Sequence, residues 1–70
     1  MSTQREPFRL LTTRDAADLL GVGPSMLERL RWMGEGPPYV RPTGGRIVRY
    51  RYKDLMDWIE RNCVDPSASL

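Results

Sequence analysis

The stretch that decides the fold is TTRDAADLLGVGPSMLERLRWMG, residues 12–34. Its first half begins with Thr12 and carries Asp15 three positions later, which is the spacing of a capping box at the start of a helix. Gly21 then supplies the residue type that most readily adopts the left-handed backbone found at helix ends. Between them, apolar side chains recur at the spacing of one helical face, at Ala16, Leu19 and Leu20. We therefore predict a short helix over residues 13–20.

The second half of the stretch predicts another helix, over residues 24–33. Pro24 suits the first turn, where its missing N–H is not needed, and Gly34 suits the end. The apolar side of this helix is expected to consist of Met26, Leu27 and Leu30, with Val22 as an apolar plug between the two helices. Two short helices joined by a glycine-containing turn form the helix-turn-helix pattern.

The segment after the second helix predicts a β-hairpin. Two adjacent prolines first exclude a helical continuation. We expect a short strand at residues 39–41 and a return strand at residues 46–51, which is rich in β-branched and aromatic residues. The turn between them, Pro42-Thr43-Gly44-Gly45, contains the glycines that a tight hairpin needs. Alternation along the return strand places Val48 and Tyr50 on one face.

A third helix is predicted over residues 52–62, with Trp58 as the largest core residue of the domain. The fold class is therefore mainly α with a small β-hairpin, in the order helix-helix-strand-strand-helix. The core is expected to consist of apolar side chains from all of these elements: Leu19, Leu20, Val22, Leu27, Leu30, Tyr50, Leu55, Trp58 and Ile59.

The chain of 70 residues is short enough to form one small domain, which we place at residues 10–62. Residues 1–9 are expected to form a flexible arm, and residues 63–70 a frayed tail. One of the two leucines at Leu10 and Leu11 is expected to pack against the first helix, as in a hydrophobic staple.

The composition argues against several classes of protein. The chain has one cysteine, Cys63, and no histidine, so neither an internal disulfide nor a metal site is expected. No apolar run approaches the ~20 residues that span a bilayer, and the N-terminus lacks the apolar segment of a secretory signal. We therefore expect a cytoplasmic protein without a membrane partner. The sequence shows no nucleophile pair, general base or phosphate-binding loop, so neither an enzyme nor a cofactor is expected.

Positive charge is concentrated in one segment. Residues 41–53 contain five basic residues and no acidic ones: Arg41, Arg46, Arg49, Arg51 and Lys53. The rest of the chain holds the remaining six of the eleven basic residues and all nine acidic ones. Such segregation is typical of a protein that binds a polyanion, although a solvated basic loop produces the same pattern.

The ordered set of motifs resembles the small excisionase-type DNA-binding domains, which are winged-helix relatives of the MerR-like and AlpA-like regulators. The resemblance covers residues 10–62. It rests on Leu11-Thr12, Leu19-Leu20-Gly21-Val22, Gly34, Gly44-Gly45, Val48-Arg49-Tyr50, Asp54-Leu55 and Trp58. It implies a winged helix-turn-helix fold in which the hairpin is the wing.

The resemblance also implies roles for individual residues on double-stranded DNA. The second helix would enter the major groove, with Ser25, Glu28, Arg29 and Trp32 as its candidate contacts. Arg29 could pair with guanine and Glu28 with cytosine. For Trp32, packing against the following loop is an equal alternative. The wing and its flanks would contact phosphates and the minor groove through Arg41, Arg46, Arg49, Arg51 and Lys53. Arg49 could instead brace the wing through an ion pair with Asp54 or another carboxylate.

The start of the second helix departs from the family pattern. It carries Gly23, Pro24 and Met26 where polar or basic residues are usual. Pro24 has no N–H for a phosphate, and Met26 forms no hydrogen bond with a base. We therefore expect modest intrinsic sequence specificity, supplemented by DNA shape or by several bound copies.

Three functions fit the resemblance. The first is a bacteriophage excisionase, an architectural protein whose copies bind adjacent sites in the bacterial host, bend DNA and direct an integrase toward excision. It is favoured because the sequence shows no coiled-coil segment after the domain, as MerR-like regulators have. The second is a small AlpA-like transcriptional regulator. The third is a packaging or assembly module that holds protein partners.

Overall fold

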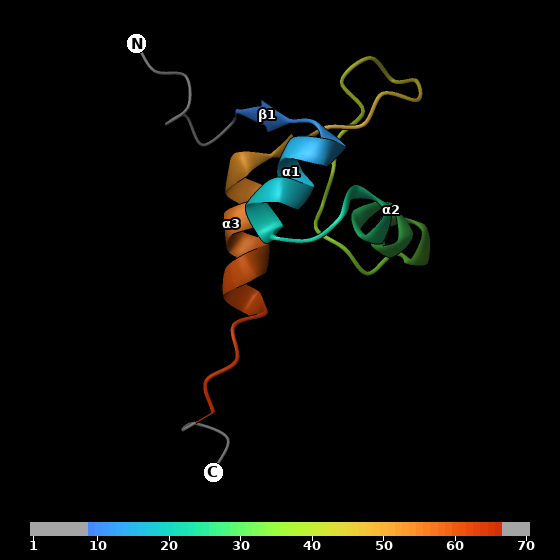
Figure 1. Ribbon diagram of the computed structural model, residues 1–70. Coiled ribbons are helices and arrows are strands. Elements are labelled where there is room, and N and C mark those ends of the chain that lie inside the picture. The colour runs from blue at the N-terminus through green and yellow to red at the C-terminus, as the bar shows by residue number, and fades with distance from the viewer. Residues whose placement is uncertain (1–8, 67–70) are drawn as a thin grey trace.

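The computed structural model describes residues 9–66 and consists of three helices and a two-stranded antiparallel sheet. The elements follow one another as β1 (Leu10–Leu11), α1 (Thr13–Leu20), α2 (Pro24–Met33), β2 (Tyr50–Arg51) and α3 (Tyr52–Arg61). A hairpin loop, residues 40–49, lies between α2 and β2 (Figure 1) and is called the wing below. This arrangement confirms the predicted fold class, a mainly helical winged helix-turn-helix.

The first two helices have the predicted bounds because local signals fix both ends of each. Thr12 Oγ1 accepts a hydrogen bond from the Asp15 N–H at 3.0 Å and so caps α1. Gly21 and Gly34 end α1 and α2 with φ angles of 75° and 70°. This is the left-handed conformation that favours glycine. The third helix ends at Arg61, one residue before the predicted end.

The sheet includes a segment for which the sequence predicts no strand. Leu10 faces Arg51 and Leu11 faces Tyr50, so the chain just before α1 forms the partner strand of β2. Arg9, the one described residue of the predicted arm, continues this pairing, since its carbonyl accepts a hydrogen bond from Tyr52 N at 2.8 Å. The rest of the predicted arm, residues 1–8, lies outside the described residues, as do residues 67–70 of the predicted tail.

The predicted ladder between residues 39–41 and 46–51 is reduced to one bridge. Val40 and Arg49 exchange two backbone hydrogen bonds, with N···O distances of 2.8 and 2.9 Å. Hydrogen-bonded pairs of an antiparallel ladder recur at every second residue. The next donors on this strand would be Pro38 and Pro42, which have no N–H. The ladder therefore stops on both sides of Val40, and Tyr50–Arg51 pairs with β1 instead.

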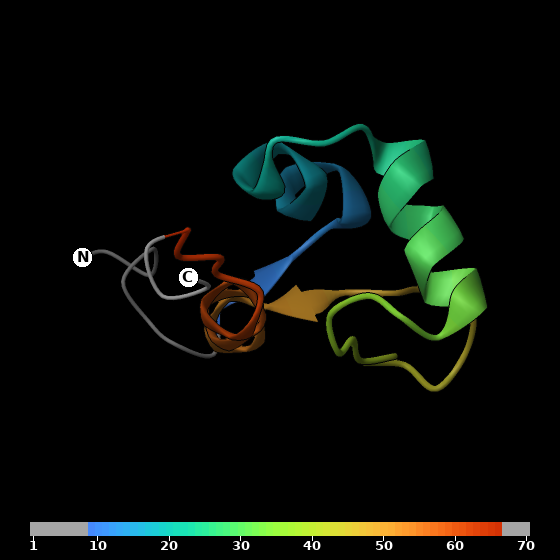
Figure 2. The ribbon, with the colours of Figure 1, turned by 90° about the horizontal axis from the view of Figure 1, so that it is seen from below.

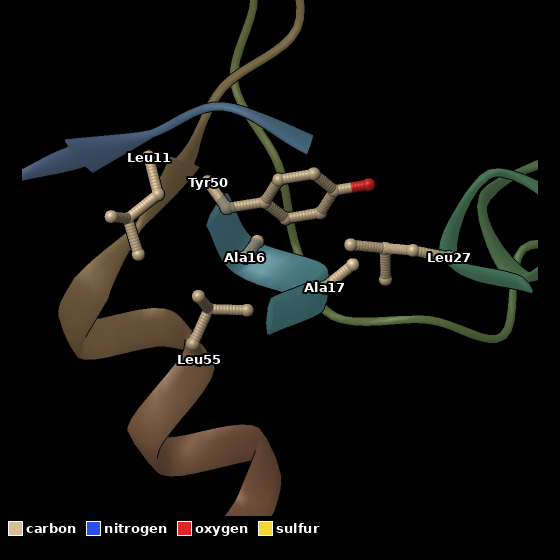
Figure 3. Close-up of a cluster of buried hydrophobic side chains, with 6 residues drawn as sticks. All are labelled: Leu11, Ala16, Ala17, Leu27, Tyr50 and Leu55. Carbon is tan, nitrogen blue, oxygen red and sulfur yellow. The ribbon is translucent and has the colours of Figure 1, made fainter. Parts of the chain in front are cut away.

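The core lies where α1, α2, α3 and the sheet meet. Its buried side chains are Leu11, Ala16, Ala17, Leu27, Tyr50 and Leu55 (Figure 3). Tyr50 is the largest of them and is fully buried, with its ring beside the α1 alanines and its hydroxyl pointing away from Leu11. Leu20 and Val48 pack against this cluster. The predictions for Leu27, Tyr50 and Leu55, and for one of the two leucines before α1, are confirmed.

Several predicted core residues lie at the surface. Leu19, Val22 and Ile59 are exposed over 40%, 38% and 38% of their surface. On α1 the buried stripe is Ala16, Ala17 and Leu20 rather than Ala16, Leu19 and Leu20, because the helix packs between α2 and α3 and presents two small residues to them.

The position of α3 explains why Trp58 is only partly buried and does not lie at the centre of the core. Leu55, Tyr52 and Met56, in the first half of α3, contact the core, while Trp58 and Ile59 lie one turn further on. The helix continues past the end of α1 (Figure 1), so its second half has little to pack against. Leu30 of α2 is likewise only partly buried.

Candidate nucleic-acid interface

The outer face of α2 carries the four candidate contact residues. Ser25, Glu28, Arg29 and Trp32 are all exposed, whereas Leu27 on the opposite side is fully buried. Each of these four positions lies three or four residues from two of the others along α2, so they are neighbours on one side of the helix. The alternative for Trp32, packing against the following loop, is wrong, because 87% of its surface is exposed.

The wing presents arginines beside the last turns of α2. Its turn is closed by a hydrogen bond from Gly44 N to the Arg41 carbonyl at 2.9 Å, and Gly44 has a φ of 75°. Arg41 and Arg46 are exposed on either side of this turn. In the view from below, the wing lies on the same side of the molecule as the C-terminal end of α2, away from α3 (Figure 2). Glu28 and Trp32 of the outer face line hollows that wing residues also line, whereas Ser25 and Arg29 do not.

Two hollows lie between α2 and the wing, and each is named after the end of α2 that it adjoins. The N-terminal hollow, of about 490 Å³, is lined by Thr13 and Arg14 of α1, Glu28 of α2, and Arg46 and Arg49 of the wing. The C-terminal hollow, of about 590 Å³, is lined by Arg31, Trp32, Tyr39, Arg41, Arg46 and Val48. Arg31, Arg46 and Val48 line both, so the two hollows are adjacent, and together they are called the groove below. The groove is rich in arginine, and Glu28 is the one carboxylate among its lining residues.

Arg31 connects α2 to the elements around it. Its Nη1 donates a hydrogen bond to the Tyr50 hydroxyl at 2.9 Å and a longer one to Thr13 Oγ1 at 3.5 Å. Its guanidinium also lies 5.7 Å from the centroid of the Tyr39 ring, within the range of a cation–π contact. Arg31 thus links α2 to α1, to β2 and to the segment that enters the wing. These contacts hold its side chain in place as part of the groove wall.

The remaining predicted cations divide into two groups. Arg49 lies in the wing, but its Nη1 donates to the Val48 carbonyl at 2.8 Å, so the backbone rather than the predicted carboxylate braces it. Arg51 and Lys53 are ion-paired with Asp54 and Asp57 at 2.7 and 2.9 Å. Neither of the two lines the groove, because both belong to the β2–α3 junction. The structure therefore brings Arg41, Arg46 and Arg49 to α2, but not Arg51 or Lys53.

Sequence reasoning missed Arg31 and Tyr39 as parts of this surface. A signal for Arg31 is present, since it follows Leu27 by four positions and Leu30 by one. Such spacing puts a charged group at the core edge of the helix, where it needs a polar partner. Tyr50 supplies that partner, and only the fold brings it there.

Within residues 9–66, no group of three or more metal-binding side chains comes together. None of the helices described there has the length and apolar character needed to cross a membrane.

An exposed polar helix face beside a basic wing, on a winged helix-turn-helix frame, defines a DNA-binding domain. A family model described as a helix-turn-helix domain matches residues 10–63, which is most of the chain. The protein belongs to this helix-turn-helix domain family. A comparison with curated proteins finds no match.

Proposed function

We propose that this protein is an excisionase-type architectural factor, which binds DNA next to recombination sites, bends it and directs a phage integrase toward excision. The observation that carries the proposal is the groove between α2 and the wing, made of two adjacent hollows lined by arginines. A DNA strand that follows this groove has α2 on its major-groove side and the wing on its minor-groove side.

The contacts on the two sides of the strand have different roles. On α2, Arg29 is the candidate for a bidentate contact with guanine, and Glu28 for a contact with cytosine. On the wing, Arg41 and Arg46 line the groove and are the candidates for phosphate contacts, which supply affinity without sequence information. Because only a few side chains contact base edges, a single bound copy has low sequence specificity.

The low sequence specificity of one copy is compatible with function when several copies bind adjacent sites. Linked binding raises the effective concentration of each copy. Bending 20–30 base pairs costs about 1–6 kcal/mol, which the summed phosphate contacts of several copies supply. The charge distribution supports such an array, since Asp15, Asp18 and Glu60 are exposed on α1 and α3 and line neither hollow of the basic groove. In this proposal the protein acts in the cytoplasm of the bacterial host.

The second candidate is an AlpA-like transcriptional regulator on the same fold. The favouring observation is the rigid, mixed-charge face of α2, which suits one operator as well as an array of sites. The third candidate, an assembly module that binds proteins, predicts no salt-dependent binding to DNA.

Footprinting and a bending assay on the attachment region of the host genome distinguish these functions. The excisionase proposal predicts protection over several adjacent sites, stepwise shifted bands and a bend that grows with each copy. Protection of a single promoter site without a bend supports the regulator instead. Affinity should fall steeply between about 50 and 200 mM salt, because phosphate contacts release counterions. Affinity that is constant over this range would exclude both DNA-binding functions.

A further inference from the structure

Trp32 is the most exposed large apolar side chain among residues 9–66. It lies in the last turn of α2 with 87% of its surface open, and it lines the C-terminal hollow. Tryptophan normally buries most of its large apolar surface. Because this indole contributes little to the core, its position beside a groove points to a ligand with a flat apolar face.

The opposite wall of the hollow is fixed and positively charged. The Tyr39 ring packs against buried Tyr50, with centroids 6.2 Å apart and planes at 57°. The guanidinium groups of Arg31 and Arg41 lie 5.7 and 5.8 Å from the centroid of the same ring. Arg46 completes the lining, and no carboxylate belongs to it. The hollow therefore combines an open aromatic face with three guanidinium groups, which suits a ligand that has both an aromatic ring and an anionic group.

We propose that this hollow is a nucleotide subsite, in which Trp32 stacks on a base that has left the DNA helix while Arg41 and Arg46 hold the adjoining phosphates. The proposal rests on the DNA-binding function above and names a further ligand for the same groove. In an intact duplex the faces of the bases are covered by their neighbours, and only their edges are open in the grooves. The face of an indole is therefore matched only where a base is unstacked.

The adjacency of the two hollows gives such a base a route to Trp32. Arg46 and Val48 line both hollows, so a strand bound in the N-terminal hollow needs to pass only these wing residues to reach the C-terminal one. A base unstacked at that point kinks the duplex, which is a common way for architectural proteins to bend DNA. Stacking on Trp32 then offsets part of the cost of the kink.

The test compares two duplexes that differ only in one base. Each carries a single-nucleotide bulge, which is adenine in one and an abasic site in the other, so that their flexibility is closely matched. Stacking of one base on an aromatic side chain predicts about 5- to 150-fold tighter binding of the adenine bulge. The Trp32→Ala variant should lose this discrimination, and Trp32→Phe should retain most of it. Met33→Ala is the matched control, since Met33 is exposed on the same turn but does not line the hollow.

A second measurement reports on the indole directly. In the Trp58→Phe variant, Trp32 is the single tryptophan, and its fluorescence should be quenched more by the adenine bulge than by the abasic one. Equal affinity and equal quenching for the two bulges would overturn the subsite, and so would unchanged discrimination in Trp32→Ala. Quenching by polyglutamate but not by DNA would assign the hollow to an acidic protein segment instead. Failure of every duplex to bind would overturn the proposed function itself, whereas binding of intact and bulged duplexes without base discrimination would overturn only the subsite.

Discussion

The outer face of α2 and the wing both belong to the candidate interface but are built differently. The α2 face carries charges of both signs on a ten-residue helix whose other side is buried. The wing carries arginines without a carboxylate on a loop that a single pair of backbone hydrogen bonds closes at its base. A rigid face of mixed charge suits the reading of base edges, and a basic loop suits phosphates. The difference indicates that specificity and affinity come from different regions.

The largest expected effect comes from removing the residue that holds the two regions together. Tyr50→Ala deletes a fully buried ring and should lower the free energy of unfolding by about 3–5 kcal/mol, which is most of the stability of a domain this small. Thermal unfolding followed by circular dichroism measures this. Tyr50→Phe is the control: it keeps the ring and loses the hydrogen bond to Arg31, so its loss should be about 1–3 kcal/mol. A folded, stable Tyr50→Ala variant would contradict the central place of Tyr50.

The next largest effect concerns the α2 face. Arg29→Ala should weaken binding to the cognate site by about 1–3 kcal/mol and weaken binding to unrelated DNA much less, because a bidentate contact with guanine is lost. Gel-shift titrations on both DNAs measure the two losses. An equal loss of affinity on all sequences would indicate that Arg29 contacts a phosphate. The proposed difference in role between α2 and the wing would then be wrong.

On the wing, Arg46→Ala should weaken binding to every sequence by a similar factor. It should also lower the slope of log affinity against log salt by about one unit, because one phosphate contact is lost. Titrations at several salt concentrations give the slope. Arg51→Ala is the matched control, since Arg51 is ion-paired with Asp54 and does not line the groove. Equal changes in slope for the two variants would extend the phosphate surface to the start of α3.

The smallest effect tests the shape of the wing. Gly44 has a φ of 75°, and a Cβ added to it would meet nothing within 4 Å, so Gly44→Ala introduces backbone strain without a clash, about 1–2 kcal/mol. It should reduce affinity for all DNAs by displacing Arg41 and Arg46, and the strain should also lower the midpoint of thermal unfolding by several degrees. Gly45→Ala is the control, because Gly45 has no positive φ and its Cβ would make an ordinary contact at 3.8 Å with Thr43 Oγ1. Equal affinities for the two variants would show that the turn conformation does not matter.

Much of the recognition surface could be predicted from sequence, because it depends on periodicity within one helix. The side of α2 that carries Ser25, Glu28, Arg29 and Trp32 follows once Leu27 is placed in the core. The exposure of Arg41 and Arg46 follows from a glycine turn flanked by charge. What these residues contact on DNA stays a prediction. The groove that brings Glu28 and Trp32 together with Arg41 and Arg46 could not be foreseen, since its walls come from segments far apart in the chain.

The sequence by itself determined the three helices and where the basic residues gather. The ends of the first two helices are set by a threonine cap, a proline and glycines, all of which act within one turn of the backbone. Only the tertiary structure decided the pairing of Leu10–Leu11 with Tyr50–Arg51, the Ala16–Ala17 contact surface and the bond from Arg31 to Tyr50. These features depend on which surfaces of distant segments meet. The prolines on both sides of Val40 limit its pairing with the return strand of the hairpin to one bridge, so Tyr50–Arg51 pairs with a more distant segment.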